Sequence, residues 1–264
     1  MRALWTAATG MKTQQFNIDT IANNLANVNT TGYKAQRAEF KDLFYATLRR
    51  DNLVDEEGSP ANLQVGHGAM VSATRRDFSN GSFIETNGSF DLAIDGPGFF
   101  AVMLPNEEIR YTRDGSFKLS VDMDEAMLVT NEGYIVLDED DNEIYIESGL
   151  KDITIDGMGY ITAYDEDGEL VEIARLKIVE FVNPEGLLAE GSNLYRATPA
   201  SGEEIPVDAE EMDMRIMQGY LEASNVKVVD EMVKMITAQR AYEISSKAIQ
   251  TSDEMLQVIS NLKR

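Results

Sequence analysis

Two acidic runs, DEDDN at residues 138–142 and DEDG at residues 165–168, come closest to a chemical site in this sequence. Crowded carboxylates can bind a cation, and a pair of them can act as acid and base in glycan hydrolysis. Neither run follows the D-x-[DN]-x-[DN]-G-x5-E order of a calcium loop. No acidic residue lies in a sequence pattern that predicts an apolar pocket around its carboxylate. We therefore expect both runs to be solvated hairpin tips.

The remaining chemically suggestive residues are few. GPGFF at residues 96–100 is rich in glycine but lacks the lysine and the helix of a phosphate-binding loop. His67 is the only histidine, and its place between Gly66 and Gly68 is typical of a loop residue rather than a catalytic base. The chain has no cysteine, which excludes a thiolate nucleophile and a cysteine metal site. The sequence predicts a protein that is not an enzyme and has no cofactor and no metal.

The charge of the chain is unevenly distributed. The formal net charge is −23, of which residues 51–214 carry −28, while residues 1–50 carry +4 and residues 215–264 carry +1. This balance excludes a general nucleic-acid binder, which needs a basic face. The acidic middle is expected to be a solvated surface. The nearly neutral ends can pack against copies of themselves without strong repulsion.

The N-terminus is expected to be neither a signal peptide nor a membrane span. Its weakly apolar patch is interrupted early by Thr6, Thr9, Gly10 and Lys12. No run approaches the roughly 20 apolar residues that a membrane-spanning helix needs. If the protein leaves the cytoplasm, we expect it to do so without a cleaved signal.

The elements that could position functional residues begin with an N-terminal helix, predicted over residues 3–28. Thr30, Thr31 and Gly32 end it, with Gly32 suited to the left-handed position after a helix. Four asparagines crowd its last turns, either as a fraying helix end or as amides that fix the register against a neighbour. Two rows at heptad spacing form a seam: Leu4, Met11, Ile18 and Leu25, and Ala7, Gln14, Ile21 and Val28.

A second seam lies at the other end of the chain. Ser224 or Asn225 can cap a helix predicted from about residue 226 to 261. Because the N-terminal helix carries the only comparable seam, the two ends are predicted to pair inside an assembly. The C-terminal rows are Met235, Tyr242, Ile249 and Leu256, and Ala238, Ser245, Ser252 and Ile259.

Between the helices the pattern changes twice. The spacing of Phe40, Leu43, Phe44 and Leu48 predicts a second short helix within residues 35–50, followed by a loop or extended arm over 51–70. Further on, Asn-Gly and Asp-Gly pairs separate short alternating apolar runs, a pattern that predicts hairpins.

The predicted fold is α+β: coiled-coil-type helices, discontinuous in sequence, flank a β-rich middle of short antiparallel strands. The predicted domains are a helical arm (1–34), a connector and extended arm (35–75), the β-rich domain (76–210) and a C-terminal helical arm (211–264).

Several long runs are similar to one known family. ANNLANVNTTGYKAQRAEF (22–40) resembles the N-terminal signature of bacterial flagellar axial proteins, the rod and hook family. DLAIDGPGFFAV (91–102), YTRDGSF (111–117) and NLYRAT (193–198) resemble the family's β domain, and the run from Gly219 resembles its C-terminus, closest to the distal rod members. The matching N-terminal positions are Asn24, Ala26, Asn27, Thr31, Gly32, Tyr33 and Lys34.

The resemblance implies a structural subunit that assembles with copies of itself into a rigid, hollow drive shaft carrying torque from motor to hook. It implies contacts with proximal rod proteins, the hook protein, ring proteins where an outer membrane is present, and the flagellar type III export apparatus. The implied location is the basal body, spanning the periplasm after export without signal cleavage. It also implies that a stretch such as 51–70 braces neighbouring subunits, although Asp55, Glu56 and Glu57 depart from the expected composition.

Three alternatives stay open at this point: a proximal rod or hook-like axial protein, a carboxylate-dependent glycan hydrolase, and a β-rich adhesin with coiled-coil ends. Under the main interpretation, one set of residues forms the interface between copies. These residues are Leu4, Met11, Ile18, Ile21, Asn24, Leu25, Asn27, Val28, Gly32, Met235, Tyr242, Ile249, Leu256 and Ile259.

Overall fold

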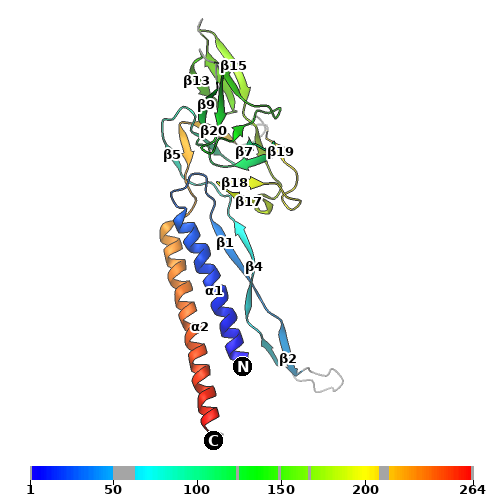
Figure 1. The fold of residues 1–264 in the computed structure, drawn as a ribbon, viewed down its shortest axis with the longest axis vertical. Coiled ribbons are helices and arrows are strands. Elements are labelled where there is room, and N and C mark those ends of the chain that lie inside the picture. Colours follow the sequence, from blue (N-terminus) through cyan, green and yellow to red (C-terminus); the bar gives the residue numbers. More distant parts are fainter. Residues whose placement is uncertain are drawn as a thin grey trace. The chain divides into compact units, whose positions relative to one another are not determined.

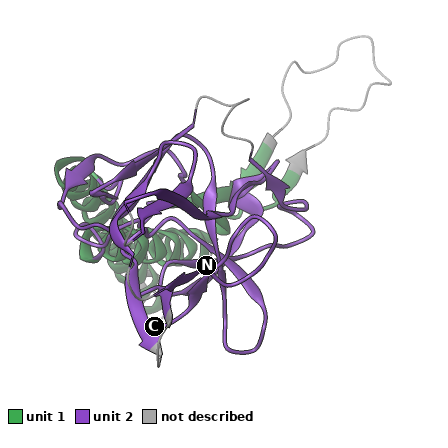
Figure 2. Ribbon diagram, turned by 90° about the horizontal axis from the view of Figure 1, so that it is seen from above, with its two compact units in different colours: residues 1–26, 36–76, 227–264 green, residues 27–35, 77–226 purple. Residues whose placement is uncertain are grey.

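The computed structural model describes residues 2–49, 63–122, 125–147, 150–165, 168–207 and 214–262. The chain divides into two compact units, coloured separately in Figure 2. Unit 1 contains residues 1–26, 36–76 and 227–264, and unit 2 contains residues 27–35 and 77–226. Both units are therefore discontinuous in sequence.

Unit 1 is built on two long helices, α1 (Arg2–Ala26) and α2 (Val228–Leu262). They lie side by side and run antiparallel, with α1 in blue and α2 in orange to red (Figure 1). Each begins and ends within two residues of its predicted limits. The expected α+β class, with flanking helices and a middle of short antiparallel strands, is confirmed.

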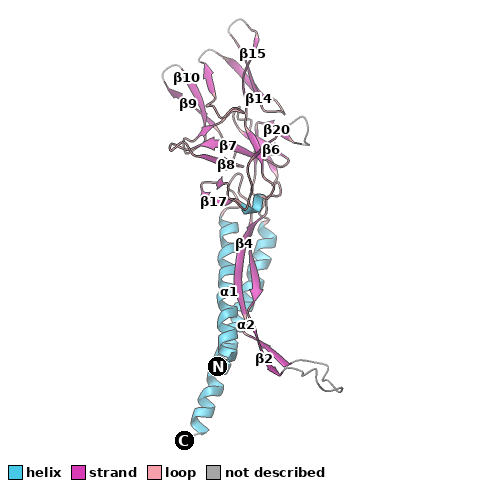
Figure 3. Cartoon of the chain, turned by 90° about the vertical axis from the view of Figure 1, so that its right-hand side faces the viewer, coloured by secondary structure: helices cyan, strands magenta, loops and turns pink. Residues whose placement is uncertain are grey.

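The predicted short helix within residues 35–50 is wrong, because this stretch forms strands β1 (Gln36–Asp42) and β2 (Tyr45–Arg49). β1 pairs antiparallel with β4 (Ala69–Arg76), and β2 pairs with β3 (Leu63–Gly66), which makes a two-part ribbon beside the helices (Figure 3). The pairing partners lie 27–40 residues downstream for β1 and 14–21 residues downstream for β2, so local apolar spacing could not reveal them.

α1 contacts α2 and also both strands β1 and β4. Of the predicted extended arm over 51–70, residues 51–62 lie outside the described residues, while 63–66 form β3 and 69–70 begin β4. The side chain of Leu48 also lies outside the described set.

Unit 2 consists of short antiparallel strands and one turn of 3-10 helix, η1 (Pro184–Gly186). Its largest sheet has the order β12-β10-β11-β7-β8-β18-β17, with β9, β16 and β19 branching from it. β13, β14 and β15 form a separate sheet, while β20 pairs with β6 and β21 with β5. The first strands are β5 (Phe83–Glu85), β6 (Leu92–Asp95), β7 (Phe99–Met103), β8 (Ile109–Thr112), β9 (Lys118–Asp122), β10 (Glu125–Val129), β11 (Ile135–Val136) and β12 (Tyr145–Glu147). The later strands are β13 (Lys151–Ile155), β14 (Tyr160–Tyr164), β15 (Leu170–Arg175), β16 (Ile178–Glu180), β17 (Leu188–Gly191), β18 (Leu194–Arg196), β19 (Ile205–Pro206), β20 (Arg215–Gln218) and β21 (Tyr220–Glu222).

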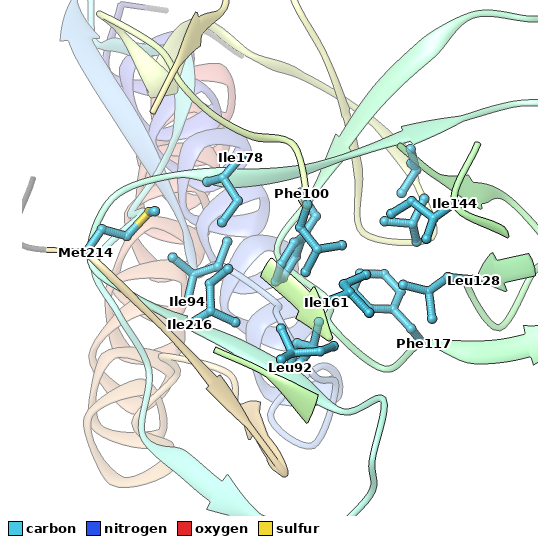
Figure 4. Packing of buried hydrophobic residues seen from close by; sticks show 14 of the residues in the cluster. Leu92, Ile94, Phe100, Phe117, Leu128, Ile144, Ile161, Ile178, Met214 and Ile216 are labelled. Atoms are coloured by element: carbon cyan, nitrogen blue, oxygen red, sulfur yellow. The ribbon is translucent and has the colours of Figure 1, made fainter. Parts of the chain in front are cut away.

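The hydrophobic core of unit 2 forms two clusters of buried side chains. In the larger one, the rings of Phe100 and Phe117 meet edge to face with centroids 5.1 Å apart, next to Ile161 (Figure 4). The GPGFF run therefore supplies a core strand rather than a loop that binds phosphate.

Only some of the glycine pairs make the predicted hairpins. Asp156-Gly157 joins β13 to β14, and Asp156 N donates to Tyr160 O at 3.1 Å. Asn87-Gly88 and Asp95-Gly96 do not join paired strands, so these hairpin predictions are wrong. The reason is non-local: β21 pairs with β5, and β20 with β6, from more than 100 residues away.

The acidic run at 138–142 is a turn, as expected. Asp138 N donates to Asn142 O at 2.9 Å, and Asp138 Oδ1 accepts the amides of Asp140 and Asn142 at 3.0 and 2.7 Å. This carboxylate is therefore used in turn formation. Within the run at 165–168, residues 166 and 167 lie outside the described residues.

Candidate functional site: the helix pair of unit 1

α1 and α2 approach closely because small residues meet between them. A Cβ built on Gly10 would lie 3.3 Å from Ser245 Oγ, and Ala238 is 2 % exposed. Asn24 near the end of α1 meets Glu231 near the start of α2, which fixes the antiparallel order. Small side chains at the contact allow the axes of the two helices to approach closely.

The most buried positions of α1 are largely polar. Thr13, Thr20 and Asn24 are buried, together with Ile21. Thr13 Oγ1 donates to Gly10 O and Thr20 Oγ1 to Phe16 O, both at 2.9 Å, so each hydroxyl is satisfied inside its own helix. This lets a threonine pack like an apolar residue. The heptad spacing of hydrophobic residues does not reveal Thr13 and Thr20, because both side chains are polar.

Asn24 connects three elements. Its Nδ2 donates to Gln36 O at 2.8 Å and to Glu231 Oε2 at 3.1 Å, while its Oδ1 accepts Gln36 N at 2.9 Å. Lys234 Nζ holds the other oxygen of Glu231 at 2.6 Å. Because Asn24 and Glu231 are buried, a shift of either helix would break these bonds without replacement by water. Within this chain, Asn24 is an amide that fixes register.

The predicted interface residues have different surroundings. On α1, Ile21 and Asn24 are buried, whereas Leu4, Met11, Ile18 and Leu25 are half-buried. On α2, Met235 and Ile249 are half-buried and Tyr242 and Leu256 are exposed, while the side chain of Ile259 lies outside the described set.

Three further predicted interface residues, Asn27, Val28 and Gly32, belong to unit 2. Asn27 and Val28 are half-buried there, and Gly32 is buried. Gly32 has the predicted left-handed conformation, with φ +66°. A Cβ on Gly32 would lie 2.6 Å from Asp114 N, so this position is occupied by packing within the chain.

α2 also carries apolar residues on the side away from Glu231, Ala238 and Ser245, which we call the uncovered face. Its side chains are between 48 % and 72 % exposed. They recur mostly three or four residues apart, as residues on one side of a helix do, and none of them belongs to the two heptad rows of the seam. A helix with apolar residues on several sides is typical of a helix buried on several sides. The uncovered face consists of Val229, Met232, Val233, Ile236 and Ile244.

In the part of the chain that the structure describes, no three His, Asp or Glu side chains are arranged to hold an ion. His67 Nδ1 lies 2.8 Å from Phe44 O in the ribbon of unit 1. None of the helices, over their described residues, is long and apolar enough to cross a membrane.

Three family models match the chain at positions that agree with this architecture. "Flagella basal body rod protein" matches residues 4–34, which cover all of α1 except its first two residues. "Flagellar hook protein FlgE/F/G D1 domain" matches residues 93–163 of unit 2, and "Flagellar basal body rod FlgEFG protein C-terminal" matches residues 217–262, which include α2.

Curated relatives match over nearly their whole length. The chain is 49 % identical to the flagellar basal-body rod protein FlgG of Borreliella burgdorferi, covering 100 % of this chain and 99 % of the relative. It is 42 % identical to FlgG of Agrobacterium fabrum and 35 % identical to the flagellar hook-basal body complex protein FlhP of Bacillus subtilis, in both cases over 100 % of each chain.

Among solved structures, the flagellar hook protein FlgE2 of Helicobacter pylori matches with a TM-score of 0.26 and 16 % identity, covering 72 % of this chain and 43 % of that one. The full-length identity to the curated relatives decides the family. The chain belongs to the family of flagellar basal-body rod proteins, the structural subunits of the rod.

Proposed function

We propose that this protein builds the distal part of the flagellar rod, where its copies assemble into a hollow helical shaft that carries torque. The observation that carries this proposal beyond family membership is the uncovered face of α2. Five exposed apolar side chains on one side of a long helix are typical of a surface that binds another protein surface.

The energetics favour assembly through the helices. Fully burying a valine or isoleucine side chain is worth roughly 1.5–3 kcal/mol. Both large hydrophobic clusters of the described chain lie in unit 2, so the helices have few such contacts of their own. Contacts between copies would supply the missing burial. Head-to-tail contacts of this kind produce an open helical array.

The heptad seam supports the same proposal in a modified form. Met235, Ile249, Ile18 and Leu25 are half-buried on the helices of one chain, so we infer that they stabilise the pair that presents the interface. Tyr242 and Leu256 stay exposed and join the proposed interface directly. Ile259 remains part of the proposal, although its side chain is outside the described set.

The proposed surroundings follow from the same role. A distal rod subunit would contact proximal rod proteins at one end and the hook protein at the other, as well as ring proteins in an envelope with an outer membrane. We infer export by the flagellar type III apparatus without signal cleavage and location in the periplasm-spanning basal body. We also infer that the protein acts without catalysis, because the carboxylate of Asp138 is used to hold a turn.

The test is a charge placed on the uncovered face. Ile236→Asp and Ile244→Asp should each block polymerisation, because a lone buried charge costs several kcal/mol at an interface. Leu25→Asp and Ile249→Asp in the seam should block it as well, with loss of helical signal in the monomer. Sedimentation measures polymer, and far-ultraviolet circular dichroism measures the fold of the monomer.

Val182→Asp is the matched control, since Val182 is 80 % exposed in unit 2 and lies on neither helix. It should polymerise normally. Wild-type polymerisation of both Ile236→Asp and Ile244→Asp would show that the uncovered face does not join copies.

A further inference from the structure

The chain passes between the two units four times, after residues 26, 35, 76 and 226. On the side of unit 2, the stretches next to these passages are residues 27–35, 77–82 and 220–226, which we call the crossing segments. They are distant in sequence but bonded to one another within unit 2. Gly32 N donates to Glu222 O at 2.8 Å, Asp77 N to Ala35 O at 2.9 Å, and Ala223 N to Ser82 O at 2.8 Å.

A buried ion pair joins all three crossing segments. Lys34 Nζ lies 2.6 Å from Glu222 Oε1, and both side chains are 1 % exposed. The same carboxylate oxygen accepts Gly81 N at 2.8 Å. Lys34 Nζ also donates to Ser79 O at 2.9 Å. One carboxylate and one ammonium thus bind the first, second and third crossing segments together.

Arg113 is a second cation near the same carboxylate. Its Nη1 lies 3.6 Å from Glu222 Oε2, and its Nη2 donates to Gly96 O at 2.8 Å. Burial lowers the pKa of Lys34, nearby Arg113 lowers it further, and Glu222 opposes both effects. Burial also lowers the pKa of Arg113. Glu222 is therefore the group that makes a buried lysine tolerable next to a buried arginine.

Asn225 makes a parallel set of bonds. Its Oδ1 accepts Ala35 N at 2.8 Å, and its Nδ2 donates to Asp77 O at 2.8 Å and Ser79 O at 3.2 Å. A single amide thus satisfies backbone groups of the first two crossing segments from a position in the third. Its geometry uses both ends of the amide, which neither aspartate nor alanine can reproduce.

We propose that Lys34, Glu222 and Asn225 form a clasp that holds the crossing segments together independently of the hydrophobic core of unit 2. A buried ion pair adds little net stability compared with an apolar pair of the same volume, but it fixes the position of its partners. All three side chains bond the segments that lead out of the unit. They are positioning residues.

The experiment is hydrogen exchange on the full-length monomer carrying Glu222→Gln or Asn225→Ala. The informative amides are those of Gly32, Asp77 and Ala223, because their acceptors are backbone oxygens that neither substitution removes. Each substitution should speed their exchange at least about tenfold. The amides of β7 and β8 should exchange as in the wild type. If Glu222→Gln does not fold, Asn225→Ala carries the test.

Two further variants separate the clasp from general stability. Asn183→Ala removes a comparable amide bond, from Asn183 Nδ2 to Ala200 O at 3.0 Å, and should leave the crossing segments unchanged. Lys34→Met with Glu222→Leu replaces the pair by apolar groups. It should recover only part of the thermal midpoint lost in Glu222→Gln, because the buried Arg113 loses its nearest carboxylate, and it should leave the crossing segments in fast exchange.

The proposal is overturned if the three amides keep their wild-type rates in both single variants. It is equally overturned if exchange rises to the same extent in β7 and β8, because the contacts would then belong to the core. Since the experiment uses the monomer, its outcome is independent of whether the uncovered face of α2 joins copies.

Discussion

Gly32 shows how much a single position in the run after α1 depends on its surroundings. The sequence predicted a left-handed residue there, and the observed φ of +66° agrees. The sequence could not predict that the backbone of Arg113 and Asp114, some 80 residues further on, passes within 3 Å of the place of a Cβ. The local sequence therefore predicted the backbone conformation of Gly32, but it could not predict the close approach of the Arg113–Asp114 backbone.

Gly32→Ala should destabilise unit 2 for two reasons, namely its positive φ and the contact with Asp114 N at 2.6 Å. Gly133→Ala is the matched control, because Gly133 has φ +88° and nothing within 4 Å of a Cβ. The control should cost about 1–2 kcal/mol of unfolding free energy for its φ alone. Gly32→Ala should cost at least about 2 kcal/mol more, measured by urea denaturation. Equal costs would show that the backbone near Asp114 gives way.

At the scale of elements, the helices were predicted well and their contact was not. Heptad spacing located α1 and α2 because a long apolar repeat at this spacing is typical of a helix. The helices meet at Gly10 and at Asn24, and the buried positions Thr13, Thr20 and Asn24 of α1 are polar, which conceals their burial in the sequence. The β1–β4 ribbon was missed because strand pairing depends on a partner far along the chain. The uncovered face was present in the sequence as a second apolar stripe on α2.

Asn24→Asp should destabilise the helix pair by about 3 kcal/mol, because it places a second buried carboxylate next to Glu231. Adding Glu231→Gln should recover part of this loss, since the amide and the carboxylate then exchange places. The recovery is incomplete because aspartate cannot donate to Gln36 O and Lys234 loses its partner. Helical circular dichroism during thermal unfolding measures both effects.

Gln15→Glu is the control for added negative charge, because Gln15 is exposed on the same helix. It should change stability by less than about 0.5 kcal/mol. If Asn24→Asp behaved like Gln15→Glu, Asn24 would not fix the register of the pair.

At the scale of the whole molecule, the two units differ in how they are stabilised. Unit 2 has two clusters of buried hydrophobic side chains, whereas unit 1 depends on a close helix pair and a polar contact at Asn24. The alternating pattern of the middle region predicted its β-rich character. It could not predict which residues close each sheet, because β20 and β21 return from just before α2 to pair with β6 and β5.

Hydrogen exchange along α2 should therefore show a gradient in the monomer. Amides near Glu231 should exchange slowly, and those of residues 250–262, where nearly every described side chain is exposed, should exchange fastest. In the polymer this gradient should disappear as the whole helix becomes protected, while β6, β7 and β8 stay protected throughout. A monomer in which α2 is as evenly protected as in the polymer would contradict assembly through the helices.

The bond between Asn24 and Glu231 spans 207 residues of sequence. A chain cut between residues 77 and 227 therefore retains α1 and its strand neighbours β1 and β4 but lacks α2, its helical partner. Such a fragment can begin to fold its β strands, yet it presents no helix pair and no uncovered face. If copies join through the helices as proposed, an incomplete chain could not enter the polymer, and assembly would depend on synthesis of the last helix.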